Sequence, residues 1–170
     1  NRDRDRLKEV VCAAFAELDG PALDTEGAAF SLEIERRWLR EDTLARLRRH
    51  LELGHRVVLV SASLEEYLLP LGRRLGVDGV VGTRLERVDG RLTGRLDGPN
   101  CRAGEKVTRL TPWLADNDLA DAVLWAYGDS QGDRELLERA DHPVWVRGVR
   151  IAAEPDPEVG VSLPWRPSTL

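Results

Sequence analysis

Two carboxylates at one strand-to-helix turn are the residues whose types and spacing best suit chemistry in this sequence. The segment Gly128-Asp129-Ser130-Gln131-Gly132-Asp133 follows the apolar run Val123–Tyr127. Carboxylate oxygens at such a turn suit Mg²⁺, which takes few protein ligands and keeps waters that a phosphate can displace. The alternative is a capping turn, with Asp129 or Ser130 as the N-cap and Asp133 in the first helical turn. A cap needs only one such side chain, and this turn offers three.

A second candidate is a small hydroxyl at the tip of a predicted strand. Ser61 and Ala62 follow the run 56–60, and a phosphate there could meet the serine hydroxyl and free backbone N–H groups. Ser63 could instead be the N-cap of a helix that starts at Leu64. Without further evidence, this capping role is the favoured interpretation.

Lys106 is a third candidate because of its place in a predicted helix. It lies near the start of the helix, in Gly104-Glu105-Lys106-Val107, whereas the helix dipole favours lysine near the end. Holding the charge of a phosphate would explain the position. The alternative is a solvated surface lysine, which is favoured if the residue is considered alone.

The elements that must position these residues alternate between strand and helix. The β-branched run 56–60 is typical of a strand buried on both faces of a parallel sheet, and Asp89-Gly90 is the two-residue turn of a predicted hairpin. We expect helices over 5–18, 22–38, 42–53, 64–75 and 103–114 and from 134, strands over 56–60, 79–82, 122–126 and 144–146, and a hairpin over 83–96. This order predicts an α/β fold with a doubly wound parallel sheet, whose ligands lie beyond the carboxyl ends of the strands.

Composition restricts the partners and the compartment. The net charge of −5 argues against a general nucleic-acid or anionic-membrane surface, and the apolar runs are too short to span a bilayer. The two cysteines, Cys12 and Cys101, form no CxxC pair, so we expect neither a disulfide framework nor a zinc site, and a cytoplasmic protein. The sequence starts at Asn1 and contains no methionine, and we expect it to be part of a longer chain.

The order of these segments resembles the haloacid dehalogenase-like phosphatases, most closely the branch that contains phosphoserine phosphatase-like enzymes. The resemblance covers about Glu41 to Val146 and is carried by VLVSAS, RVDGRLTG, GPNCRAGEK, YGDSQGDRELL and ADHPVWV. It implies a Rossmann-like core with a small helical cap. It also implies a Mg²⁺-dependent phosphomonoesterase that acts on a small phosphorylated metabolite.

The resemblance also implies a role for each candidate residue. Ser61, with Ala62, matches the phosphate-binding position, and Lys106 matches the lysine that neutralises the phosphate and the acyl-phosphate intermediate. Asp129 matches the Mg²⁺-ligating aspartate. Asp133 matches the second acid of the metal motif, which supports the water shell of the metal and the lysine.

The departure from the family pattern is the nucleophile. The family attacks phosphorus with the first aspartate of a DxDGT-like motif and protonates the leaving alcohol with the second. The nearest string is Glu17-Leu18-Asp19-Gly20-Pro21, which would need a glutamate nucleophile and a proline in place of threonine. Helical spacing before it favours a cap, so we expect a helical cap segment over 1–40, a core lacking its first strand over 41–150 and an extended C-terminal tail over 151–170.

Three functions remain open at this point. The chain could belong to a phosphatase whose nucleophile lies elsewhere, to a non-catalytic relative that binds Mg²⁺ and phosphate, or to a longer bifunctional protein. We expect a small phosphorylated substrate as the partner; the oligomeric state has no sequence signal. In the family topology the nucleophile strand lies between 57–60 and 123–127, so no regular ladder should join those two strands, and Val10–Ala16 is the candidate to fill the place.

Overall fold

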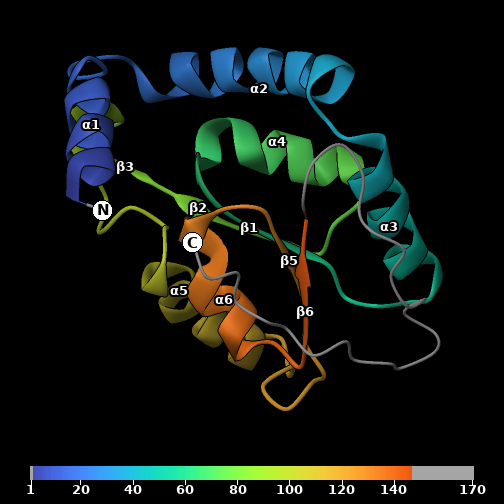
Figure 1. Cartoon of the computed structure of the whole chain (residues 1–170). Helices are drawn as coiled ribbons and strands as arrows, with labels where there is room; N and C mark the ends of the chain where they lie inside the picture. Colours follow the sequence, from blue (N-terminus) through green and yellow to red (C-terminus); the bar gives the residue numbers. More distant parts are fainter. Residues whose placement is uncertain (1, 147–170) are drawn as a thin grey trace. The chain divides into compact units, whose positions relative to one another are not determined.

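The computed structural model describes residues 2–146, which form two compact units, residues 2–39 with 57–101 and residues 40–56 with 102–146. The first unit contains α1 (Arg2–Ala13), α2 (Gly20–Arg37), β1 (Val58–Leu64), α4 (Glu65–Leu75), β2 (Gly79–Thr83), β3 (Leu85–Val88) and β4 (Arg91–Leu96). The second contains α3 (Glu41–Glu52), α5 (Gly104–Asp116), β5 (Trp125–Gly128), the 3₁₀ turn η1 (Gln131–Asp133), α6 (Arg134–Arg139) and β6 (His142–Trp145) (Figure 1). The predicted tail over 151–170 lies outside the described residues.

The strands pair as the α/β prediction requires. β1 pairs with β2 in parallel from Val58↔Gly79 to Val60↔Val81, and β5 pairs with β6 in parallel from Trp125↔His142 onward. α4 and α6 connect the strands of each pair, so each unit holds a β-α-β segment. The α/β fold class is therefore confirmed. β1 and β5 belong to different two-stranded sheets, one in each unit, and the prediction that no ladder joins them stays a prediction.

Close backbone packing organises the helices of the first unit. In Figure 1, α2 runs alongside α4. A Cβ added at Gly27 in α2 would lie 2.4 Å from the carbonyl oxygen of Glu66 in α4, so only glycine allows this approach. The other face of α4 buries Leu68 and Leu71 over the β1–β2 pair, where Gly72 faces the side chain of Val80.

The hairpin β3–β4 has the predicted two-residue turn and carries its own small core. Asp89 and Gly90 both have positive φ, 49° and 80°, as a type I′ turn requires. Behind the turn, α1 contributes Cys12 to a buried cluster with Leu85 and Leu92. Burial of these apolar side chains attaches α1 to the hairpin.

The predicted ends of the first helix and of the first strand are wrong, for identifiable reasons. The first helix ends at Ala13 rather than at residue 18, because the following turn reaches the hairpin edge, where the Glu17 N–H donates to the Leu92 carbonyl at 2.8 Å. Since Val10 to Ala13 belong to α1, the segment 10–16 does not form the proposed filling strand. β1 runs on to Leu64, so Leu64 rather than Ser63 is the N-cap residue of α4.

The second unit is built on β5 and β6, with α6 packed on them. Leu136, Leu137, Ala126 and Val144 are buried between these elements. The predicted strand over 122–126 begins at residue 125, three residues later than expected. The helix predicted from residue 134 starts there, directly after η1.

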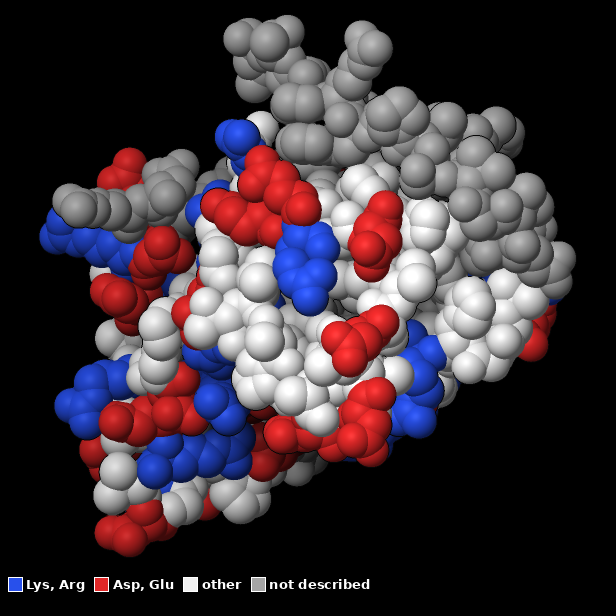
Figure 2. Space-filling view, turned by 90° about the horizontal axis from the view of Figure 1, so that it is seen from below, with Lys and Arg blue, Asp and Glu red and all other residues white. Residues whose placement is uncertain are grey.

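Charge is distributed in mixed sign over the surface. Figure 2 shows acidic and basic side chains interspersed on one face. Exposed ion pairs such as Arg134–Glu138 occur on the described part of the chain. Within residues 2–146, no helix combines the length and apolar character needed to cross a membrane.

Candidate active site

The turn after β5 brings a buried aspartate against the end of the strand. Ser130 is the N-cap residue of η1, and its N–H and hydroxyl donate to Asp133 Oδ2 at 3.0 and 2.6 Å. A Cβ added at Gly128 would lie 2.5 Å from the Asp133 Cβ, so glycine is what allows this packing. The capping interpretation is correct for Ser130 and Asp133, but it does not include Asp129.

Asp133 forms a buried ion pair with Lys106. The Lys106 ammonium donates to Asp133 Oδ1, and both side chains are 9% exposed. Burial by itself would raise the pKa of Asp133, but the hydrogen bonds from Lys106 and Ser130 hold it below its usual range. Lys106 is the third residue of α5, and the interpretation of it as a solvated surface lysine is wrong.

Asp129 lies at the same turn with its carboxylate exposed. Among the described residues it makes no hydrogen bond, although it acts electrostatically on Arg40. Arg40 is also hydrogen-bonded to Asp42 at 3.1 and 2.8 Å, and Asp42 and Asp129 both raise the pKa of the guanidinium. Sequence reasoning missed Arg40, which belongs to no motif and precedes α3 by one residue.

The turn offers few protein ligands to a magnesium ion. Both oxygens of Asp133 accept hydrogen bonds from Lys106 and Ser130, which leaves Asp129 as the accessible carboxylate. Residues 2–146 contain no group of three or more histidine, cysteine, aspartate or glutamate side chains placed to hold a metal. Because Mg²⁺ is held in many enzymes by one or two carboxylates together with waters and substrate phosphate, the turn is compatible with it.

The predicted phosphate-binding serine lies in the first unit. Ser61 is half-buried in β1, and its Oγ accepts a hydrogen bond from the Ser63 N–H at 3.1 Å. The β1–β2 register is irregular between Val60 and Leu64, so this stretch departs from the regular ladder. Lys106, Asp129 and Asp133 belong to the second unit. Convergence of all four residues on one pocket therefore stays a prediction.

The histidines of the second unit form a cluster that sequence analysis did not anticipate. His50 Nδ1 lies 2.9 Å from His55 Nδ1, and His50 Nε2 lies 2.8 Å from the Tyr127 hydroxyl. Burial, reinforced by His55 and Arg46, lowers the pKa of His50 to about 4. The His50 ring is therefore neutral near pH 7 and contributes to packing of α3 on β5.

Comparison with known proteins assigns the family. The profile described as haloacid dehalogenase-like hydrolase matches residues 1–138. Protein CicA of Caulobacter vibrioides is 37% identical over 153 residues, which are 89% of this chain and 66% of that protein. A phosphoserine phosphatase of Streptococcus thermophilus is 33% identical over 113 residues, 66% of this chain and 49% of the enzyme. The chain thus spans between about half and two-thirds of the length of these relatives.

A solved structure shares the fold of this chain. The crystal structure of a protein of unknown function from Bordetella pertussis Tohama I superposes with a TM-score of 0.69 at 30% identity, covering 83% of this chain and 65% of that one. The chain belongs to the haloacid dehalogenase-like hydrolase family, in the branch with the phosphoserine phosphatases.

Proposed function

We propose that this chain is part of a Mg²⁺-dependent phosphomonoester hydrolase that acts on a small phosphorylated metabolite. The observation that carries the proposal is the buried Lys106–Asp133 pair at the carboxyl end of β5, in a chain of this hydrolase family. A phosphatase relative that is 33% identical supports the reaction class.

Lys106 would supply fixed positive charge at the reaction centre. A buried ammonium held by Asp133 and the η1 turn is already oriented, so it can stabilise charge on a transferring phosphoryl group without rearranging at the moment of reaction. Asp133 would keep Lys106 in place rather than contact the substrate. In this proposal Lys106 and Asp129 are the catalytic residues of the chain, while Ser61 and Ala62 bind the phosphate.

Asp129 would be the principal residue that holds the metal, with Asp133 as the second acid of the motif. Bound Mg²⁺ would supply Lewis-acid neutralisation of phosphate charge. The exposed Asp129 carboxylate is available for this role because the cap of η1 does not use it. The nearby Arg40 would limit the negative potential at the turn before any cation binds.

The attacking carboxylate is not supplied by the residues assigned above. In the string nearest to a nucleophile motif, Asp19 instead caps α2 by accepting the Ala22 N–H at 3.0 Å, and Glu17 lies in the turn against β4. We therefore propose that the nucleophile lies outside this sequence. Lysine and Mg²⁺ stabilise a transferring charge but cannot replace the attacking group.

The test uses the 170-residue chain and the longer polypeptide encoded by its full reading frame. We expect the chain to bind Mg²⁺ by calorimetry without hydrolysing p-nitrophenyl phosphate, and the longer protein to hydrolyse it, with EDTA abolishing turnover. Asp129→Asn should remove Mg²⁺ binding, while Asp116→Asn, at the end of α5, should retain it. Unchanged Mg²⁺ affinity in Asp129→Asn, or turnover by the short chain, would refute the assignments.

A further inference from the structure

A polar network lies behind the irregular end of β1, which carries the proposed phosphate-binding serine. The Ala62 carbonyl accepts hydrogen bonds from the Lys8 ammonium and from Thr83 Oγ1, the latter at 3.0 Å. The same peptide unit contains the Ser63 N–H, which donates to Ser61 Oγ. The C=O and N–H of a trans peptide point in opposite directions, so groups that hold the carbonyl also aim the N–H.

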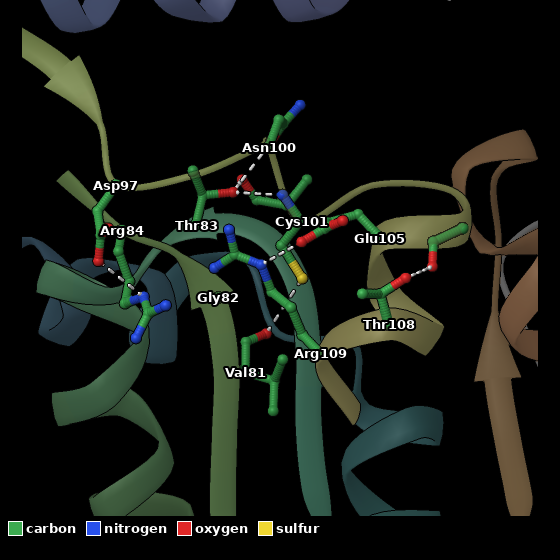
Figure 3. Close-up of polar contacts among 12 residues, drawn as sticks. Val81, Gly82, Thr83, Arg84, Asp97, Asn100, Cys101, Glu105, Thr108 and Arg109 are labelled. Atoms are coloured by element: carbon green, nitrogen blue, oxygen red, sulfur yellow. Dashed lines mark hydrogen bonds and ion pairs between the residues drawn. The ribbon is translucent and has the colours of Figure 1, made fainter. Parts of the chain in front are cut away.

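The groups that hold this carbonyl are themselves fixed. Asn100 Oδ1 accepts from Lys8 at 3.2 Å and from Thr83 at 2.9 Å, while its Nδ2 donates to Asp5 Oδ1 at 2.7 Å. Thr83 is completely buried and accepts the Cys101 N–H at 3.0 Å. Figure 3 shows its hydroxyl between Asn100 and the Cys101 backbone. Because Thr83 has one hydroxyl proton, it can donate to Ala62 or to Asn100 but not to both, whereas Lys8 can serve both at once.

Within residues 2–146 the hydrogen bonds of the Lys8 ammonium go to neutral oxygens rather than to a carboxylate. Its ammonium donates to two neutral oxygens, those of Ala62 and Asn100, although the side chain is half-buried. Burial lowers the pKa of Lys8 against the opposing effects of Cys12, Cys101 and Asp5. A partly desolvated cation of this kind gains from an anion brought to the end of β1, and its charge polarises the Ala62–Ser63 peptide so that the N–H is a stronger donor.

We propose that Lys8 of α1 is a positioning residue for phosphate binding: through the Ala62 carbonyl it fixes the Ser63 N–H, whose hydrogen bond to Ser61 Oγ orients the Ser61 hydroxyl toward a bound phosphate. The inference rests on the proposed function of Ser61. Through the Ala62 carbonyl, α1 would thus orient a part of β1 that is distant from it in sequence. A phosphate dianion near Ser61 would also reduce the electrostatic cost of keeping Lys8 charged.

The test follows the Ser63 amide resonance of the ¹⁵N-labelled chain while inorganic phosphate is added. In Lys8→Met we expect the Ser63 ¹⁵N shift to change already without phosphate, and phosphate affinity to fall about tenfold, the scale expected for a charge-assisted hydrogen bond. Lys8→Arg should partly restore both. Arg6→Met, which removes the same charge from an exposed position of α1, should change neither.

Failure of the role proposed for Lys8 and failure of the role proposed for Ser61 would give different results. If Lys8→Met leaves both the Ser63 resonance and the phosphate affinity as in the wild type, or alters stability alone, the positioning role is refuted. If the wild-type chain itself binds no phosphate, the function proposed for Ser61 fails, and the phosphate-free Ser63 resonance still decides whether Lys8 positions the peptide. Should Lys8→Met fail to fold, Lys8→Gln replaces it, and the same two readings apply.

Discussion

At the scale of single residues, the buried Lys106–Asp133 pair stabilises the fold and also holds the Lys106 ammonium in place at the candidate site. Lys106→Met would leave Asp133 buried with only its Ser130 hydrogen bonds, and we expect a loss of about 3 kcal/mol in the free energy of unfolding at pH 7. Urea denaturation measures this loss. The exposed pair Arg134–Glu138 is the control, since Arg134→Met should cost less than about 1 kcal/mol. Equal losses in the two variants would contradict a buried pair.

The lowered pKa of His50 should make the free energy of unfolding depend on pH. Its folded-state pKa of about 4 lies below the ordinary value of 6.5, so the unfolded chain takes up this proton first as the pH falls. We therefore expect stability to decrease from about pH 6.5 to pH 4 by about 1–3 kcal/mol. The contribution of Asp133, whose pKa is lowered, is present above its unfolded pKa of about 4 and is lost only below that pH.

The variant His50→Gln isolates this effect. Glutamine keeps a donor and an acceptor near Tyr127 but does not titrate, so the decrease between pH 6.5 and pH 4 should largely disappear. Urea unfolding at several pH values provides the measurement. An undiminished decrease in His50→Gln would assign it to other groups.

At the scale of elements, the turn after β5 depends on the absence of a side chain at Gly128. In Gly128→Ala the new Cβ would lie 2.5 Å from the Asp133 Cβ, so the turn must shift and weaken the ion pair. We expect a loss of about 1–3 kcal/mol in thermal or urea unfolding. Gly104→Ala, at the first position of α5 with no atom within 4 Å of the new Cβ, should be neutral or slightly stabilising. Comparable losses in both would show that the clash is not the cause.

Helices, strands and turns are predicted well where the residues that determine them are close together in the sequence. The Asp89-Gly90 turn and the start of α6 follow from backbone preferences and capping residues that are close in sequence. The end of α1 and the extension of β1 were missed because they depend on hydrogen bonds to partners far along the chain. Asp133 and Lys106 were found by motif, but their direct pairing depends on contacts between α5 and η1 that no spacing rule predicts.

At the scale of the whole molecule, each compact unit has its own buried residues. Leu92 and Leu137 are each 1% exposed, the former in β4 of the hairpin and the latter in α6. Truncation of either to alanine should cost about 2–5 kcal/mol. We expect Leu92→Ala to reduce amide-exchange protection mainly in the hairpin, and Leu137→Ala to reduce it mainly in β5 and β6. Equal loss of protection in both places, in both variants, would show that the units unfold as one.

The attachment of α1 and α2 to the hairpin has a consequence for engineering. The chain from Glu17 to Gly20 hydrogen-bonds to the edge of β4, and Arg87 of β3 binds Asp24 of α2 at 2.9 and 2.6 Å. Because Cys12 of α1 is also buried against Leu85 and Leu92, the two helices and the hairpin depend on one another for their packing. A chimera that exchanges the helices with those of a relative should therefore carry residues 2–37 and 85–96 together. A graft of either segment alone would lose the hydrogen bonds and the ion pair between them.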